Sequence, residues 1–245
     1  LMTALDAGTG KVGWETPNGW GWAMTHSWVM PVTVDGRRMY VYCGSGGVAG
    51  VEAATGAVLW ETDAWKVSIA TVPSPVDLGE GRLLLSGGYG AGAMIVKLHP
   101  PTASKSEWKV SVERKLTPEQ FGAEQHTPIL SDGFVYGVRA GGQMVCLDRA
   151  GNVKWSSGSV RFGLGAFLIA AGRIYAINDT GTLGVMDAKP DAFKLLSKAK
   201  VIPEAQECWG PPALADGRLI VRDLTRLICV DVRDNGSVAQ GGPHD

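Results

Sequence analysis

One stretch of this sequence decides its fold: residues 144–155 read MVCLDRAGNVKW. The stretch holds an apolar run, an aliphatic-Asp step, a glycine turn and a closing tryptophan. Similar stretches end at Trp14 and Trp60, so the pattern returns about every 46 residues. Repeats of about 40–50 residues that contain several short strands are typical of β-propellers, in which each repeat forms one blade.

Short strands and tight turns precede each of these stretches. Asp132-Gly133 comes before the apolar run 134–138, and Asp35-Gly36 comes before residues 37–42. Asp-Gly pairs suit two-residue hairpins because glycine tolerates positive φ and aspartate bonds its own turn. No window carries a long apolar stripe of period 3.6. The sequence therefore predicts an all-β protein, a β-propeller of four-stranded antiparallel blades.

The repeat pattern also predicts the boundaries of a single propeller domain over residues 1–245. We expect a partial blade, four complete blades, a three-stranded final blade and a tail at residues 1–15, 28–61, 72–110, 127–158, 166–200, 211–233 and 234–245. The chain begins within the third strand of a blade, and the last blade stops after its third strand. Because a propeller closes when one end of the chain completes the blade of the other, we expect residues to precede Leu1.

Composition narrows the class of protein. The chain has 34 Gly, 9 Trp and 45% hydrophobic residues, which fits a turn-rich all-β domain with a filled core. The formal net charge of −1 gives no general attraction to nucleic acid, so no nucleic-acid partner is expected. No apolar run approaches 18–20 residues, so no transmembrane segment is expected either.

The repeats resemble a known family, the PQQ-like (pyrroloquinoline-quinone-like) propeller repeats of quinoprotein dehydrogenases and of the bacterial outer-membrane assembly lipoprotein. Residues 4–14, 51–60 and 146–155 carry this resemblance. The closing segment 207–223 is similar to that of a bacterial subgroup of PQQ-binding-like repeat proteins. The resemblance implies the C-terminal part of a seven- or eight-bladed ring. It also implies a bacterial protein that is secreted or periplasmic.

The same resemblance raises the possibility of an enzyme. Quinoprotein dehydrogenases hold PQQ in the central channel with an adjacent Cys-Cys disulfide, a tryptophan and a Ca²⁺ ion beside a catalytic aspartate. The four cysteines here stand apart, at Cys43, Cys146, Cys208 and Cys229. The cofactor clamp is therefore missing from this segment, and we expect no cofactor and no metal site in it. The alternative is a PQQ- and calcium-dependent alcohol or sugar dehydrogenase whose clamp lies in preceding blades.

Several recurring residues are interpreted as framework. We expect the repeat tryptophans to occupy one position, to seal blade interfaces and to bond their N–H groups: Trp14, Trp60, Trp108 and Trp155. We expect the carboxylates of the aliphatic-Asp step to accept bonds from turn amides: Asp6, Asp148, Asp187 and Asp231. Cys146 and Cys229 precede equivalent steps, which favours buried core residues.

Residues that depart from the repeat are better candidates for a site. They gather just before the first strand of each blade, where the chain crosses between blades and approaches the central channel. The candidates for a ligand-binding site at one channel mouth are His26, Trp28, Glu124, His126 and Trp209. Aromatic faces with a few polar groups suit a sugar, a peptide or another small ligand. The alternative is that these side chains only fill the narrow end of the channel.

The sequence therefore predicts a non-catalytic binding or scaffold propeller with a protein, peptide or glycan partner. No catalytic residue is proposed, since no Gly-x-Ser-x-Gly elbow occurs and no short-spaced set of metal ligands is present. The quinone-dependent oxidoreductase stays open as the second hypothesis.

Overall fold

The computed structural model describes residues 1–233, and every regular element there is a strand. The predicted tail, 234–245, lies outside the described residues. The strands are β1 (Met2–Leu5), β2 (Val12–Thr16), β3 (Met30–Val34), β4 (Arg37–Gly44), β5 (Gly47–Glu52), β6 (Val58–Thr62), β7 (Val76–Gly79), β8 (Arg82–Gly87), β9 (Gly92–His99), β10 (Lys109–Leu116), β11 (Ile129–Ser131), β12 (Phe134–Val138), β13 (Met144–Asp148), β14 (Val153–Ser156), β15 (Ala166–Ala170), β16 (Arg173–Ile177), β17 (Thr182–Asp187), β18 (Leu195–Lys200), β19 (Ala213–Ala215), β20 (Arg218–Arg222) and β21 (Leu227–Asp231).

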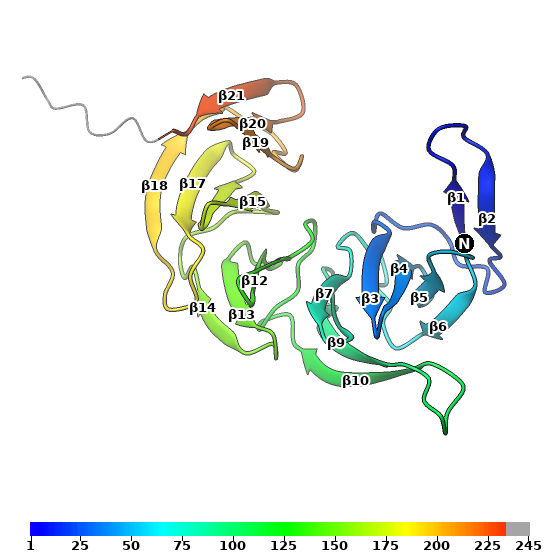
Figure 1. Cartoon of the computed structure of the whole chain (residues 1–245). Helices are drawn as coiled ribbons and strands as arrows, with labels where there is room; N and C mark the ends of the chain where they lie inside the picture. The colour runs from blue at the N-terminus through cyan, green and yellow to red at the C-terminus, as the bar shows by residue number, and fades with distance from the viewer. Residues whose placement is uncertain (234–245) are drawn as a thin grey trace, which may run out of the picture.

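The strands form successive antiparallel sheets, which we number as blades in chain order. The first blade is the pair β1-β2, the second to fifth are the four-stranded sheets β3–β6, β7–β10, β11–β14 and β15–β18, and the sixth is the three-stranded sheet β19–β21. Figure 1 shows the blades following one another around an arc, with β6, β10, β14 and β18 along its outer side. On the inner side, β11 contacts both β7 and β15. This arrangement confirms the predicted fold of four-stranded antiparallel blades.

The Asp-Gly pairs form the predicted two-residue turns. Both residues have positive φ at Asp35-Gly36 (50° and 73°), Asp132-Gly133 (48° and 82°) and Asp216-Gly217 (48° and 72°). Positive φ at both central positions is the geometry of a type I′ turn, whose twist matches that of the flanking strands. These turns set the register between the first and second strands of three blades.

The core is divided among the interfaces between neighbouring blades. One cluster joins Val41 of β4 to Leu83 of β8, and another joins Tyr136 of β12 to Ile174 of β16. Similar clusters lie between the third and fourth blades and between the fifth and sixth. Each blade is therefore held mainly by the blades beside it, as expected for a radial repeat.

Three repeat tryptophans occupy the predicted position in the last strand of their blades. Trp14, Trp60 and Trp155 each lie opposite the residue that precedes the aliphatic-acidic step. The indole N–H of Trp14 donates to the carbonyl oxygen of Ala53 at 3.1 Å, and that of Trp155 donates to the carbonyl oxygen of Lys189 at 2.7 Å. Both acceptors belong to the following blade, so these tryptophans seal blade interfaces.

The expectation that Trp108 shares this position is wrong. The connection between β9 and β10 includes a bridge between Thr102 and Lys105, and Trp108 lies before the first residue of β10. The indole packs against the core between the second and third blades. Its N–H is buried without a hydrogen-bond partner among the described residues. The longer connection therefore shifts the tryptophan out of the repeat register.

The predicted role of the acidic step is confirmed at Asp6, Asp148 and Asp231. Their carboxylates accept hydrogen bonds from the turn amides of Thr9 (2.8 Å), Ala150 (2.9 Å) and Arg233 (3.0 Å). Asp187 differs, because its carboxylate lies 3.7 Å from the ammonium group of Lys194.

The burial of each cysteine depends on the position of its blade in the arc. Cys43, Cys146 and Cys208 are buried, whereas Cys229 is exposed. The expectation that Cys229 is a buried equivalent of Cys146 is wrong. The fifth blade covers Cys146, but within residues 1–233 no further blade packs over the sixth, and β21 is its edge strand.

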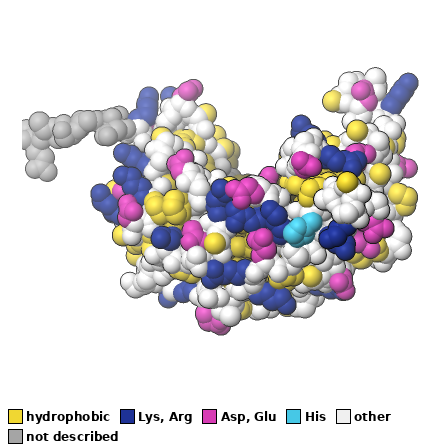
Figure 2. Space-filling model, turned by 60° about the horizontal axis from the view of Figure 1, so that its bottom comes forward, with side chains coloured by type: hydrophobic (Ala, Val, Ile, Leu, Met, Phe, Trp, Pro, Cys, Tyr) yellow, Lys and Arg dark blue, Asp and Glu magenta, His cyan; other side chains and the backbone are white. Residues whose placement is uncertain are grey.

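The third blade extends further than the repeat pattern predicts. Strand β10 continues to Leu116, beyond residue 110 where its blade was expected to end. Figure 2 shows basic and acidic side chains interspersed on the forward face, and a hollow between the two ends of the arc. Within residues 1–233, no helix is long and apolar enough to cross a membrane.

Candidate functional site

Four of the five candidate residues line one cavity. His26, Trp28, His126 and Trp209 border a space of about 400 Å³. The rest of the lining comes from Met30, Val72, Ser74, Gln125, Thr127, Phe167 and Pro211. Five blades, the second to the sixth, thus contribute to one cavity, which we call the channel-mouth cavity. Its size falls in the usual range for small-ligand sites.

Hydrogen bonds from backbone amides to side-chain hydroxyl groups connect the crossover segments around this cavity. The amide of Trp28 donates to the Ser74 hydroxyl at 2.7 Å, and the amide of Ser74 donates to the Thr127 hydroxyl at 2.9 Å. Both hydroxyl residues directly precede a proline that opens the first strand region of their blade. Each crossover is therefore tied to the next, which fixes the backbone beneath Trp28 and His126.

His126 supplies the most enclosed polar group of the cavity. Its side chain is half-buried, and Nε2 is shielded from solvent without a hydrogen-bond partner among the described residues. Burial lowers the pKa of the imidazole to about 4, against the opposing attraction of the Asp179 carboxylate. The ring is therefore neutral at pH 7, with one nitrogen able to donate and the other able to accept.

The two tryptophans of the cavity differ in exposure and support. Trp28 is 70% exposed, so most of its ring surface is free at the rim. Trp209 is half-buried, and its indole N–H donates to Asp179 Oδ1 at 3.1 Å. Trp209 is thus fixed from behind, while Trp28 offers an open face.

Asp179 is a site residue that the sequence did not reveal. It lies in the turn between β16 and β17, where Asn178 already accepts the amides of Thr180 (3.1 Å) and Thr182 (2.8 Å). The Asp179 carboxylate instead accepts the amide of Leu164 at 3.2 Å, together with the indole of Trp209. Asn178 alone is enough to form this turn. The presence of a second turn-forming residue beside it, Asp179, was the available signal in the sequence that Asp179 has another role.

Glu124 does not line the cavity, contrary to expectation. The amide of Ala123 donates to the Ser86 hydroxyl at 2.7 Å, which binds this segment to the end of β8. The Glu124 side chain then lies over Gly88, where an added Cβ would come within 2.3 Å of Glu124 Cγ. The contact with the third blade therefore places the Glu124 side chain over Gly88 and not in the cavity that His126 lines.

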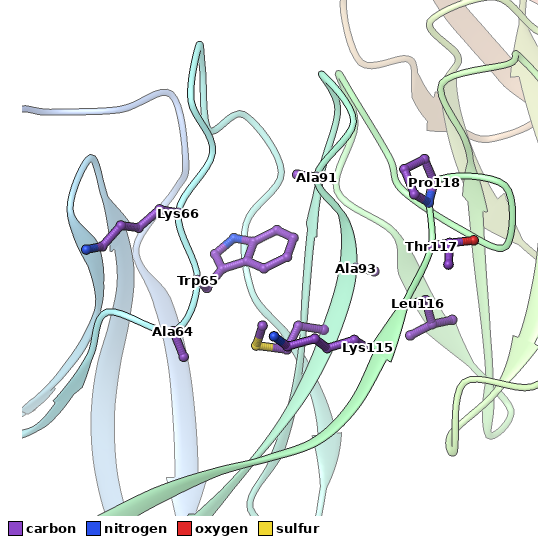
Figure 3. A pocket seen from close by; sticks show the side chains of 10 residues that line it. Ala64, Trp65, Lys66, Ala91, Ala93, Lys115, Leu116, Thr117 and Pro118 are labelled. Atoms are coloured by element: carbon purple, nitrogen blue, oxygen red, sulfur yellow. The ribbon is translucent and has the colours of Figure 1, made fainter.

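Among the other cavities, the largest is about 460 Å³ and lies between the fifth and sixth blades, where Tyr175 and Val230 line it. One of about 300 Å³ shares His26 with the channel-mouth cavity and is also lined by Met24 and Ile69. Figure 3 shows another, of about 330 Å³, where Trp65 faces β9 and Lys115 extends from β10. Trp65 is buried in the core cluster of the second and third blades. This last cavity is a packing groove between blades and contains none of the candidate residues.

Candidate metal ligands are not clustered in the part of the chain that the structure describes. Residues 1–233 contain no group of three or more His, Cys, Asp or Glu side chains placed to hold a metal ion. The cysteines are all free there, and three of them are buried in separate blade cores.

Comparison with known proteins agrees with this architecture. The fold and its repeats define a β-propeller of PQQ-like blades. A family model described as outer membrane protein assembly factor BamB matches residues 1–95 and again residues 92–191. The chain belongs to this PQQ-like repeat family. No curated protein matches it.

Two solved structures are similar to this chain at low sequence identity. Quinohemoprotein alcohol dehydrogenase from Comamonas testosteroni is 14% identical, with a TM-score of 0.55 over 89% of this chain and 48% of that one. BamB from Moraxella catarrhalis is 13% identical, with a TM-score of 0.47 over 93% of this chain and 74% of that one. The chain thus spans about half the length of the dehydrogenase.

Proposed function

We propose that this protein is a non-catalytic binding module, in which the channel-mouth cavity receives a protein, peptide or glycan ligand. One observation carries the proposal: residues that break the repeat in separate blades meet around a single cavity. His26 and Trp28 come from the crossover into the second blade, His126 from that into the fourth, and Trp209 from that into the sixth. Framework packing accounts for the repeated positions, and a shared ligand accounts for the departures from them.

The chemistry of the lining supports binding rather than catalysis. Trp28, Phe167 and Trp209 provide apolar faces, while Gln125, His126 and Thr127 provide hydrogen-bonding groups. Pockets of this composition orient a ligand through a few polar contacts inside an apolar wall. His126 lacks a nucleophile or carboxylate bonded to its Nε2 among residues 1–233, so no proton relay is assembled there.

The residues present do not fit PQQ with calcium. PQQ carries several carboxylates, yet no lysine or arginine lines the channel-mouth cavity. The described residues also offer no adjacent cysteine pair and no carboxylate cluster for Ca²⁺. We therefore derive no quinone chemistry for this segment. The family description, an outer membrane protein assembly factor, supports the further proposal of a bacterial protein in the periplasm or outside the cell.

Calorimetric titration tests the proposed binding function. The protein is titrated with uncharged oligosaccharides, with uncharged apolar peptides, and with PQQ plus CaCl₂, and each titration is repeated with Trp28→Ala. We expect saturable binding of one uncharged probe, weakened at least about tenfold by the loss of an aromatic face. Leu5→Ala, an exposed apolar change on β1, is the matched control and keeps wild-type affinity. Binding of PQQ alone, or binding unaffected by Trp28→Ala, would contradict the proposal.

A further inference from the structure

Three neighbouring polar groups of the channel-mouth cavity are uncharged at neutral pH. Gln125 carries an amide, His126 a neutral imidazole and Thr127 a hydroxyl. Thr127 accepts the amide of Ser74 and still keeps its own O–H to donate. Neither Lys, Arg, Asp nor Glu is among the lining residues. A charged ligand would lose its hydration here without gaining a Lys, Arg, Asp or Glu partner in the lining.

Two indole rings flank these polar groups from distant blades. Trp28 precedes β3 and Trp209 precedes β19, and these strands lie on opposite sides of the arc in Figure 1. The bond from the Trp28 amide to Ser74 holds the Trp28 backbone, and the bond from the Trp209 indole to Asp179 holds the Trp209 ring. A ring that is already held lowers the ordering cost of binding.

The local backbone favours recognition by side chains over strand addition. Residues 125–127 lie outside every strand, between the end of β10 and the start of β11. An extended peptide binds most simply by adding to an exposed sheet edge, where backbone groups pair in series. Met30 of β3 and Phe167 of β15 bring two edge strands to the cavity, but the polar groups of Gln125, His126 and Thr127 belong to no strand. A compact ligand with many hydroxyl groups can form hydrogen bonds with these side chains directly.

We infer that the ligand of the channel-mouth cavity is a neutral saccharide, with one sugar ring stacked on Trp28 and its hydroxyls bonded to Gln125, His126 and Thr127. This inference rests on the proposed binding function and names its ligand class. A sugar ring joins an apolar C–H face to a rim of hydroxyl donors and acceptors, which matches an indole beside neutral polar groups. Acidic sugars find no Lys or Arg in this lining and are disfavoured.

The test compares neutral and charged probes of similar size. Chitotetraose and cellotetraose are the neutral probes, tetragalacturonic acid is the acidic probe, and acetyl-Leu-Trp-Leu-amide is the apolar peptide probe. We expect saturable calorimetric binding of a neutral sugar and no measurable binding of the acidic one. Trp28→Ala weakens the sugar about tenfold or more, whereas Trp28→Phe keeps most of the affinity because a ring face remains.

Ile69→Ala separates the sugar from an apolar peptide. Ile69 is 72% exposed and lines the adjacent cavity, not the channel-mouth cavity, so it contributes surface for an apolar peptide but none for the sugar. We expect unchanged sugar affinity in this variant. Peptide binding that depends on Trp28, with no sugar binding, would overturn the saccharide and leave the binding module standing. Failure of every uncharged probe would overturn both.

Discussion

The indole N–H of Trp209 lies 3.1 Å from Asp179 Oδ1, which joins the crossover of the sixth blade to a turn of the fifth. The same carboxylate accepts the amide of Leu164 at 3.2 Å. One acidic side chain therefore anchors an aromatic wall of the cavity and the loop before β15. The cavity depends on contacts between blades, and its walls are not built within any single repeat.

Asp179→Ala should destabilise this junction. The substitution leaves two partly buried donors without an acceptor, and we expect a loss of about 1–3 kcal/mol in the free energy of unfolding. Asp179→Asn keeps a carbonyl oxygen and should lose less. Urea denaturation followed by tryptophan fluorescence measures both variants. Equal losses would show that the negative charge, rather than hydrogen-bond acceptance, is what matters at this position.

His126 should make stability depend on acidity. Its imidazole has a pKa of about 4 in the folded protein, below the ordinary value of 6.5, because burial disfavours the charged ring. Between these values the unfolded chain binds a proton that the folded protein does not. This contribution to stability is therefore complete above about pH 6.5, declines as the pH falls, and is lost by about pH 4, with a total of about 1–3 kcal/mol.

The comparison of wild type with His126→Gln isolates this effect. The variant cannot titrate at this position, so its free energy of unfolding should fall less between pH 6.5 and pH 4. Asp179 faces His126 and remains present in both proteins. Denaturant titrations at four or five pH values provide the comparison. If the free energy of unfolding of the two proteins changed in parallel with pH, burial would not lower the pKa of His126.

The packing of Trp60 over Gly50 gives a prediction about the framework. A Cβ added at Gly50 would come within 2.3 Å of the Trp60 indole nitrogen. Gly50→Ala should therefore force the ring or the strand to move, at a cost of about 1–3 kcal/mol. Gly19→Ala is the control, because an added Cβ there meets nothing within 4 Å. Thermal unfolding should show a lower Tm for Gly50→Ala only.

Cysteine reactivity should distinguish the sixth blade from the others. Burial raises the pKa of the Cys43 thiol to about 12 and that of the Cys146 thiol to about 11, so neither forms thiolate at pH 8. Cys208 is also buried, and only Cys229 is exposed. We expect one fast-reacting thiol with Ellman's reagent in the native protein and none in Cys229→Ser. Two or more fast thiols would contradict this burial pattern.

Much of the fold could be predicted from the sequence because its determinants are local. Asp-Gly turns, the acidic step and the alternating runs act within a few residues, and each of them recurs in several blades. Trp108 was misplaced because a longer connection between β9 and β10 changed the register, which the spacing of tryptophans alone does not report. Cys229 was misplaced because its burial depends on a neighbouring blade.

The candidate site was predictable only in part for the same reason. Departures from the repeat lie in the crossovers, and four of the named side chains line one cavity. The direction of Glu124 depends on how its segment binds Ser86 in the third blade. The role of Asp179 depends on the approach of Trp209 from the sixth blade. The local sequence does not report which partner either side chain meets, although the Asn178-Asp179 pair marks one of the two positions.

Fluorine NMR of the protein labelled with 5-fluorotryptophan tests the central claim most directly, with signals assigned through Trp28→Phe and Trp209→Phe. The protein is titrated with chitotetraose, cellotetraose and the apolar tripeptide. We predict that the Trp28 and Trp209 signals shift together with one dissociation constant, while the interface tryptophans Trp60 and Trp155 stay unchanged. If none of these probes moves Trp28 and Trp209, or if only the interface tryptophans respond, the channel-mouth cavity is not the binding site.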